Sequence, residues 1–262
     1  ALACAAWFYS KSDIEGEERE FALGALIAAA NVLAVIALSA EALGYYDRAQ
    51  ALASGEAITR LENTKQFALS AVWTIFGAIA LIIGIRRSSI AVRVGGLMLL
   101  ALATGKALAI DLRYYNAEWH TLLFNPTFAS FALLIFALAV GIWFYGPSED
   151  AKDRERSVVP LLIGVANLLA IVSLSTEVMG YFWRARAVVD RQFVEEILRL
   201  NNNEQFALSV LWIVYGAVAL SIAIVKPRKS LRLGALILLS LATMKVVALD
   251  SHFYDASWHT LI

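Results

Sequence analysis

Seven long apolar blocks, separated by short polar segments, constrain this chain more than any other feature of its sequence. The hydrocarbon core of a bilayer is about 30 Å thick, and an α-helix needs roughly 20 apolar residues to cross it. A helix satisfies its own backbone hydrogen bonds, whereas an open strand in lipid cannot. We therefore predict an all-α membrane protein with seven spans, at residues 21–46, 66–86, 90–111, 127–145, 157–182, 205–225 and 231–250.

The composition agrees with a membrane protein and excludes several other classes. Hydrophobic residues make up 60% of the chain and charged residues 17%, whereas soluble domains are nearer half apolar and a quarter charged. A soluble bundle of buried helices is the alternative, and it is not expected because the blocks offer no polar face to water. The zero net charge provides no basic field for nucleic acid. Packing accounts for the lone cysteine, Cys4, because it lies in an apolar run. The lipid bilayer is the expected partner, and neither nucleic acid nor a cofactor is expected.

The second feature is an internal repeat. Residues 67–122 align without a gap to residues 206–261, at an offset of 139 residues, and about half of the aligned residues are identical. Upstream the offset is 136, so that ANVLAVIALSAEALGYY at 30–46 matches ANLLAIVSLSTEVMGYF at 166–182. A length difference in one loop reconciles the two offsets. The sequence therefore predicts tandem units of four transmembrane helices, and an even number of spans per unit makes the units parallel.

The repeat divides the chain into three parts. Residues 1–9 are interpreted as the end of a transmembrane helix, because WFYS at 7–10 matches WFYG at 143–146. Residues 10–145 form the first four-helix unit, and residues 146–262 form a second, incomplete one. We expect the chain to be a piece of a longer protein, with further repeats or other membrane subunits as partners.

Basic residues gather in the loop before the first helix of each unit and in the turn between its second and third helices. Because basic loops stay in the cytoplasm, we predict a multi-pass protein of the bacterial inner membrane with these loops inside the cell. The other connections then face the periplasm. One of them, residues 183–200, has apolar residues at helical spacing and predicts an outer-face helix that ends at the asparagines 201–203.

Each unit carries a lysine and a glutamate inside its spans. Lys106 and Lys245 lie near the outer end of the third helix, and Glu41 and Glu177 lie at a similar depth in the first helix. A charged group within a span costs about 2.5–3.5 kcal/mol on insertion scales, so that it needs a partner or water. We predict that Lys106 pairs with Glu41 and that Lys245 pairs with Glu177. Such pairs either line an ion or substrate path or act as a structural clamp.

An aspartate, a tryptophan and a histidine follow each of these lysines. Asp111 and Asp250 lie five residues after them, about 140° away around an α-helix, and are not expected to pair with them. His120 and His259 are candidate general bases or ligands, with the aspartates as candidate acids. The alternative is loop packing in the aromatic belt of the membrane interface, to which three tryptophans are assigned: Trp119, Trp183 and Trp258. No paired cysteine, HExxH or acidic loop predicts a metal site.

The stretch ALSVLWIVYGAVALSIAIVKPRKSLRLGALILLSLATMKVVALD at 207–250 carries a recognisable pattern. Its positions are Trp212, Tyr215, Gly216, Arg232, Gly234, Thr243, Lys245 and Asp250. The first unit repeats them, with Phe76 in place of the tyrosine, at Trp73, Gly77, Arg93, Gly95, Thr104, Lys106 and Asp111. The pattern resembles a bacterial family of very polytopic predicted membrane proteins, catalogued as a domain of unknown function, number twenty-three thirty-nine. The resemblance implies a long, many-helix inner-membrane protein, and it supplies no substrate and no catalytic residue.

Three functions fit these observations. The first is transport or flipping of a lipid-linked or other small substrate along the paired charges. The second is a membrane scaffold or assembly subunit of a larger complex. The third is a periplasmic-face transferase or hydrolase that uses His120, His259 and the adjacent acids, and it is the least expected. Transport is expected first, narrowly ahead of a scaffold, because ionisable residues within a span are functional candidates by default.

Overall fold

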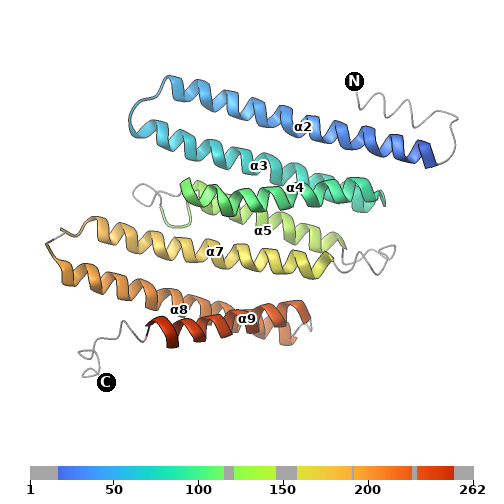
Figure 1. The fold of residues 1–262 in the computed structure, drawn as a ribbon. Helices are drawn as coiled ribbons and strands as arrows, with labels where there is room; N and C mark the ends of the chain where they lie inside the picture. The colour runs from blue at the N-terminus through green and yellow to red at the C-terminus, as the bar shows by residue number, and fades with distance from the viewer. Residues whose placement is uncertain (1–16, 115–120, 146–157, 191, 226–228, 251–262) are drawn as a thin grey trace. The chain divides into compact units, whose positions relative to one another are not determined.

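The computed structural model describes residues 17–114, 121–145, 158–190, 192–225 and 229–250 (Figure 1). Over these residues the fold is built from helices; no strand forms there, and one isolated bridge joins Thr121 to Phe124. The described elements, in chain order, are α2 (Glu17–Ala51), α3 (Glu56–Arg86), α4 (Ile90–Ala109), η1 (Asp111–Tyr114), α5 (Pro126–Tyr145), α7 (Val158–Ala187), α8 (Val194–Val225), α9 (Lys229–Lys245) and η2 (Val246–Asp250).

Seven of the described helices are long and apolar enough to cross a membrane. Each of them contains or overlaps one of the seven predicted blocks, so the predicted all-α membrane fold is confirmed at this level. Residues 1–9, which the sequence predicts to end a further helix, lie outside the described residues.

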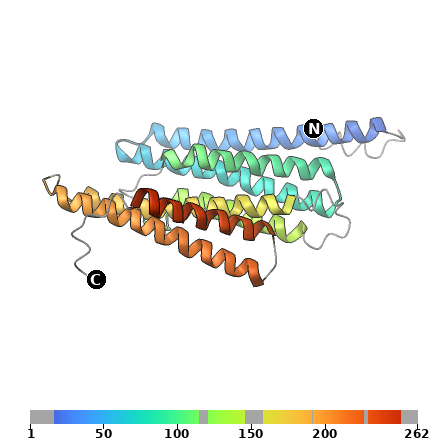
Figure 2. The ribbon, with the colours of Figure 1, turned by 60° about the horizontal axis from the view of Figure 1, so that its bottom comes forward.

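The chain divides into two compact units. The first unit contains Ala1–Tyr115 and Ala129–Asp153, and the second contains Asn116–Phe128 and Arg154–Ile262. Within the first unit, α3 packs against both α2 and α4, and two views show these helices side by side (Figures 1 and 2). Within the second unit, α8 packs against α7 and α9, and α7 also reaches α9.

Small residues let the backbones of α3 and α4 approach closely. A Cβ atom added to Gly96 would lie 2.6 Å from the backbone nitrogen of Leu81, and one added to Gly84 would lie 2.5 Å from that of Arg93. Lipid tails are as apolar as the helices, so close packing must supply the attraction that the hydrophobic effect supplies in water. The buried side chains of Leu81 and Leu100 fill the interior beside these crossings.

In the second unit, small residues likewise allow α8 and α9 to pack closely. A Cβ atom added to Gly216 would lie 2.8 Å from the side chain of Leu239. Ala219 and Ala223 on α8 and Ala235 on α9 are buried as well. A stripe of small side chains thus brings the two helices together.

Two helices begin about ten residues before the predicted spans. α3 starts at Glu56 and α8 at Val194, whereas hydropathy predicted starts near 66 and 205. The predicted separate helix over 183–200, ending at the asparagines 201–203, is therefore wrong, because residues 194–203 are the first turns of α8.

Several polar residues of these early turns are bonded across the helical hairpins, which helps the helices to continue through them. Arg186 at the end of α7 donates hydrogen bonds to Asn201 and Glu204 on α8. Lys65 on α3 forms ion pairs with Asp47 of α2 at 3.0 Å and with Glu62 at 3.1 Å. The Asn201 side chain, which could otherwise compete for the backbone of its own helix, is bonded to Arg186 instead.

The hairpins are longer than a bilayer core. α3 has 31 residues and α8 has 32, which at 1.5 Å per residue is roughly 46–48 Å of helix. The hydrocarbon core takes about 30 Å of this length. Roughly 15 Å of polar-ended helix is thus left to lie in the headgroups or beyond them.

Candidate functional site

The buried charges of the first unit form a closed polar cluster between α3 and the end of α4. Lys106 Nζ donates to the Gln66 carbonyl at 2.9 Å, to Ser70 Oγ at 2.9 Å and to Asp111 Oδ1 at 2.5 Å. The Ser70 hydroxyl donates to Asp111 Oδ2 at 2.6 Å. Lys106 is 6% exposed and Asp111 2%. All three ammonium protons and both carboxylate oxygens therefore have partners. We call these four residues the Lys106 cluster.

The Lys106 cluster overturns two predictions. The predicted pairing of Lys106 with Glu41 is wrong, because Lys106 bonds to Asp111, Ser70 and Gln66 instead. The expectation that Lys106 and Asp111 do not pair is also wrong. It assumed one continuous α-helix, but α4 ends at Ala109 and Asp111 opens the 3₁₀-helix η1. The backbone therefore turns before the aspartate and brings it back to the lysine.

Lys245 makes the corresponding contacts in the second unit. Its Nζ donates to the Gln205 carbonyl at 3.0 Å and to Ser209 Oγ at 2.8 Å. α9 ends at Lys245 and continues as the π-helix η2 up to Asp250, whose side chain lies outside the described part of the structure. The predicted pairing of Lys245 with Glu177 is wrong too, because Glu177 has other partners.

Glu177 on α7 is held by the loop that precedes α5. Its Oε1 accepts a hydrogen bond from Asn125 Nδ2 at 2.6 Å, and its Oε2 accepts one from the Leu123 backbone N–H at 2.9 Å. Glu177 and Asn125 are each 4% exposed. Two charge-assisted hydrogen bonds to one carboxylate fix the loop to the helix. We call residues 121–125 together with Glu177 the Glu177 latch.

The loop is shaped locally for this contact. Asn125 Oδ1 accepts a hydrogen bond from the Phe128 N–H at 2.7 Å, so Asn125 caps α5, and Pro126 occupies the first helical position. Leu123 has a φ of 63°, a left-handed conformation that costs a non-glycine residue about 1–3 kcal/mol. This conformation accompanies the bond from the Leu123 N–H to Glu177. The latch is thus built from a cap, a strained residue and a carboxylate that depend on one another.

Glu41 on α2 occupies the position that aligns with Glu177, but its surroundings differ. Its side chain is exposed, and no described residue donates a hydrogen bond to it. The apolar part of α2 as a whole has no buried residue. The neighbouring contacts are nevertheless the same in the two helices, because Trp73 donates to Ser39 at 2.9 Å and Trp212 donates to Ser175 at 3.0 Å.

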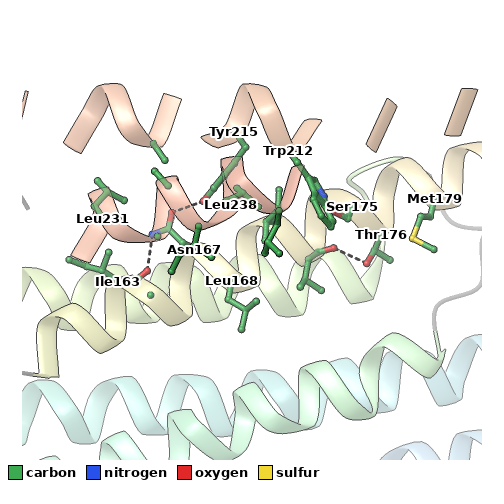
Figure 3. Close-up of a pocket in the computed structure, with 18 residues that line it drawn as sticks. Ile163, Asn167, Leu168, Ser175, Thr176, Met179, Trp212, Tyr215, Leu231 and Leu238 are labelled. Atoms are coloured by element: carbon green, nitrogen blue, oxygen red, sulfur yellow. Dashed lines mark hydrogen bonds between the residues drawn. The ribbon is translucent and has the colours of Figure 1, made fainter. Parts of the chain in front are cut away.

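A groove of about 490 Å³ lies between α7, α8 and α9 (Figure 3). Its polar lining residues bond to one another or to their own helix. Tyr215 donates to Asn167 Oδ1 at 2.8 Å, Asn167 donates to the Ile163 carbonyl at 2.8 Å, and Trp212 bonds to Ser175. Apolar side chains make up most of the wall. Chemically, the groove suits an acyl chain or an apolar side chain better than a polar substrate.

Several predicted site residues cannot be placed, because they lie outside the described residues: Trp119, His120, Trp258 and His259. Their roles, and those proposed for Asp250, stay predictions. Trp183 is described and exposed, near the end of α7. Over the described residues, no three His, Cys, Asp or Glu side chains gather as a metal site.

The sequence carried a signal for some of the residues that it did not identify. The aligned hydroxyls of Ser70 and Ser209 lie within spans, where such groups commonly bond to a neighbouring helix, but the sequence did not identify the lysines as their partners. Asn125 followed by Pro126 is an N-cap signature that predicts where α5 begins. Leu123 carried no signal, because it contributes a backbone N–H that any residue type except proline offers.

A family model described as "Predicted membrane protein (DUF2339)" matches residues 1–119 and 114–258. This is the family that the pattern over 207–250 resembles. No curated protein and no solved structure matches the chain.

Proposed function

The chain belongs to this family of predicted membrane proteins, and we propose that it serves as a membrane scaffold built from tandem four-helix units. The Lys106 cluster carries the proposal. Lys106 and Asp111 saturate each other and Ser70 away from water. They therefore join α3 to α4, and they have no free donor to offer a moving ion or substrate.

Recurring contacts support the tandem arrangement. Lys106 and Lys245 each donate to a glutamine carbonyl and a serine hydroxyl one helix away. The bonds from Trp73 and Trp212 to a serine recur in the same way. Identical contacts at the offsets of the sequence repeat are what tandem copies of one helical unit produce.

The polar ends of the hairpins support a role in assembly. The α2–α3 and α7–α8 hairpins each extend roughly 15 Å past a bilayer core, and ion pairs stiffen their ends. Rigid elements outside the membrane are suited to hold partner proteins. We place these ends in the periplasm of a bacterial inner membrane, because the opposite ends carry the basic loops.

A flux measurement tests the scaffold against transport. The purified chain is reconstituted into lipid vesicles, and proton flux and leaflet exchange of a fluorescent phospholipid are measured. We expect both rates to equal those of protein-free vesicles, in the wild type and in Lys106→Met. Protein-dependent flux that Lys106→Met abolishes overturns the proposal.

Photo-crosslinking tests the assembly role directly. Leu33 on α2, which is 54% exposed, is replaced by a photo-reactive benzoylphenylalanine, and membranes are irradiated before mass spectrometry. A scaffold of repeated units predicts protein adducts whose peptides come from helical units of the same kind. Adducts with lipid alone contradict it.

A lipid transporter is the second candidate, favoured by the apolar groove of the second unit. Gly164 lines the groove, and an added Cβ there would meet no atom within 4 Å, so Gly164→Phe is chosen to occupy the groove from a position where the backbone leaves room for a side chain. If the groove carries lipid, fluorescent phospholipid exchange is present and falls in Gly164→Phe. Gly95→Phe is the matched control, because Gly95 has equally open surroundings and does not line the groove.

A further inference from the structure

We propose that the face of α2 around Glu41 binds a loop from another helical unit, one that presents a backbone N–H and an asparagine carboxamide as residues 121–125 present them to Glu177. The inference rests on the tandem arrangement proposed above. It adds the chemistry of the contact between successive units and names the residue that receives it.

The first step is that Glu41 lies where the polar end of the hairpin meets the hydrocarbon. It is six residues from Asp47, whose side chain is 61% exposed and bonds to Lys65 near the polar end of the hairpin. Six residues of helix are roughly 9 Å. Ala51, where α2 ends, is ten residues or roughly 15 Å from Glu41, so this carboxylate lies at the edge of the hydrocarbon, where it needs donors or water.

The second step is that one face of α2 is bare where the same face of α7 is covered. On α7, Ser173, Glu177 and Gly180 are buried along one face. On α2 the aligned Ala37 and Glu41 are exposed. Among the described residues, a donor loop thus reaches the carboxylate on α7 and none reaches the aligned carboxylate on α2.

The third step is that the contact chemistry is already known from Glu177. Its two oxygens take one side-chain amide and one backbone N–H, a pairing that lipid headgroups without such a rigid pair of donors do not reproduce. The aligned surroundings of Glu41 also match, because the ring pair Tyr45–Tyr46 has the same edge-to-face geometry as Tyr181–Phe182, with centroids 5.2 Å apart in both.

The experiment adds a copy of such a loop in register with α2. Ala1, Leu2 and Ala3 align with Ala137, Leu138 and Ala139. A copy of residues 112–136 placed directly before Ala1 therefore puts the loop sequence of the latch where Glu41 would meet it. Original and extended chains, in lipid nanodiscs, are treated with dicyclohexylcarbodiimide, which modifies carboxyl groups in apolar surroundings. Labelling of Glu41 and Glu177 is followed by mass spectrometry.

In the original chain we expect Glu41 to be labelled and Glu177 to be protected. In the extended chain the labelling of Glu41 falls about tenfold or more, since two hydrogen bonds to a carboxylate hold the added loop closed. Replacing the asparagine of the added loop by alanine restores the labelling. Glu41→Gln lowers the midpoint of thermal unfolding of the extended chain by about 3 °C or more and leaves that of the original chain unchanged.

Equal labelling of Glu41 in both chains, with Glu177 still protected, overturns the proposal, because the protected Glu177 shows that the extended chain is folded. If the extension prevents folding, Asn125→Ala in the original chain decides. This change exposes Glu177 to the reagent if the latch protects it, and continued protection removes the template on which the proposal rests. Crosslinks from Leu33 to another unit without protection of Glu41 refute this contact and leave the scaffold standing.

Discussion

Replacing Lys106 by methionine is the most direct test of the Lys106 cluster. Methionine has a similar length and no charge, so the change removes the ammonium group while largely filling its space. Asp111, which is 2% exposed, then keeps the Ser70 hydroxyl as a donor and loses the cation that lies 2.5 Å away.

The expected loss follows from the burial of both charges. Removing one partner of a buried ion pair costs about 3–5 kcal/mol, because the other charge is left in a poor solvent. Changing both residues, Lys106→Met with Asp111→Asn, removes the stranded charge, and the amide oxygen still accepts the Ser70 proton. The double variant is therefore expected to regain about 2 kcal/mol or more relative to the single variant.

The free energy of unfolding is measured by titrating mixed micelles with sodium dodecyl sulfate and following helix content by circular dichroism. Lys65→Met is the matched control. Lys65 likewise forms ion pairs, here with two carboxylates, but the Asp47 side chain is 61% exposed and the Glu62 side chain 25%, so the expected loss is about 0–1 kcal/mol. The reasoning is refuted if Lys106→Met costs no more than Lys65→Met, or if the double variant is no more stable than the single one.

Three further predictions use the same denaturation assay. Glu177→Gln removes the charge of the latch and is expected to cost about 1.5–3 kcal/mol; an unchanged midpoint would mean that the loop does not depend on the carboxylate. Gly96→Ala places a Cβ 2.6 Å from a backbone nitrogen of α3 and should cost about 1–3 kcal/mol, whereas Gly95→Ala, with no atom within 4 Å, should gain up to about 1 kcal/mol; equal effects contradict the close crossing. Phe76→Tyr adds a hydroxyl beside Asn31, with which it lines a common cavity, and should stabilise by about 0.5–1.5 kcal/mol; a loss would show that the added hydroxyl finds no partner there.

The spans could be predicted because lipid favours apolar side chains all along the part of a helix that crosses the membrane, and hydropathy measures this preference directly. The block 66–86 is visible for this reason, and α3 ends at Arg86 as predicted. The start of α3 at Glu56 was not visible, because the turns before residue 66 contain Glu62 and Lys65. Their polarity is balanced by side chains on α2, and this balance depends on which helix lies next to them, which hydropathy does not record.

The partners of the buried charges could not be predicted, although the charges themselves could. Each residue of an α-helix turns the side-chain direction by about 100°, so a single break in the helix redirects everything beyond it. The break at Ile110 brings Asp111 back to Lys106. The sequence predicted the pair Lys106–Glu41 only because the two residues lie at a similar depth in the membrane. The carboxylate that Lys106 contacts is instead determined by the end of α4, which brings Asp111 beside it.

The polar ends of the α2–α3 and α7–α8 hairpins are both held by bonds between the two helices, but the bonded residues differ. In the first unit Gln50 on α2 donates to Glu62 on α3 at 2.8 Å. In the second unit the aligned pair is Arg186 on α7 and Asn201 on α8, which also bond. At the third aligned position the charge is opposite in the two units: Lys65 in the first unit aligns with Glu204 in the second, and Glu204 accepts a hydrogen bond from Arg186. In both hairpins a bond thus joins the two helices, although the charges at the aligned positions differ. The lysine contacts nearer the membrane are alike in both units, whereas the exposed ends differ. Under the scaffold proposal, partner choice thus varies at the outer ends without disturbing the contacts that hold each unit together.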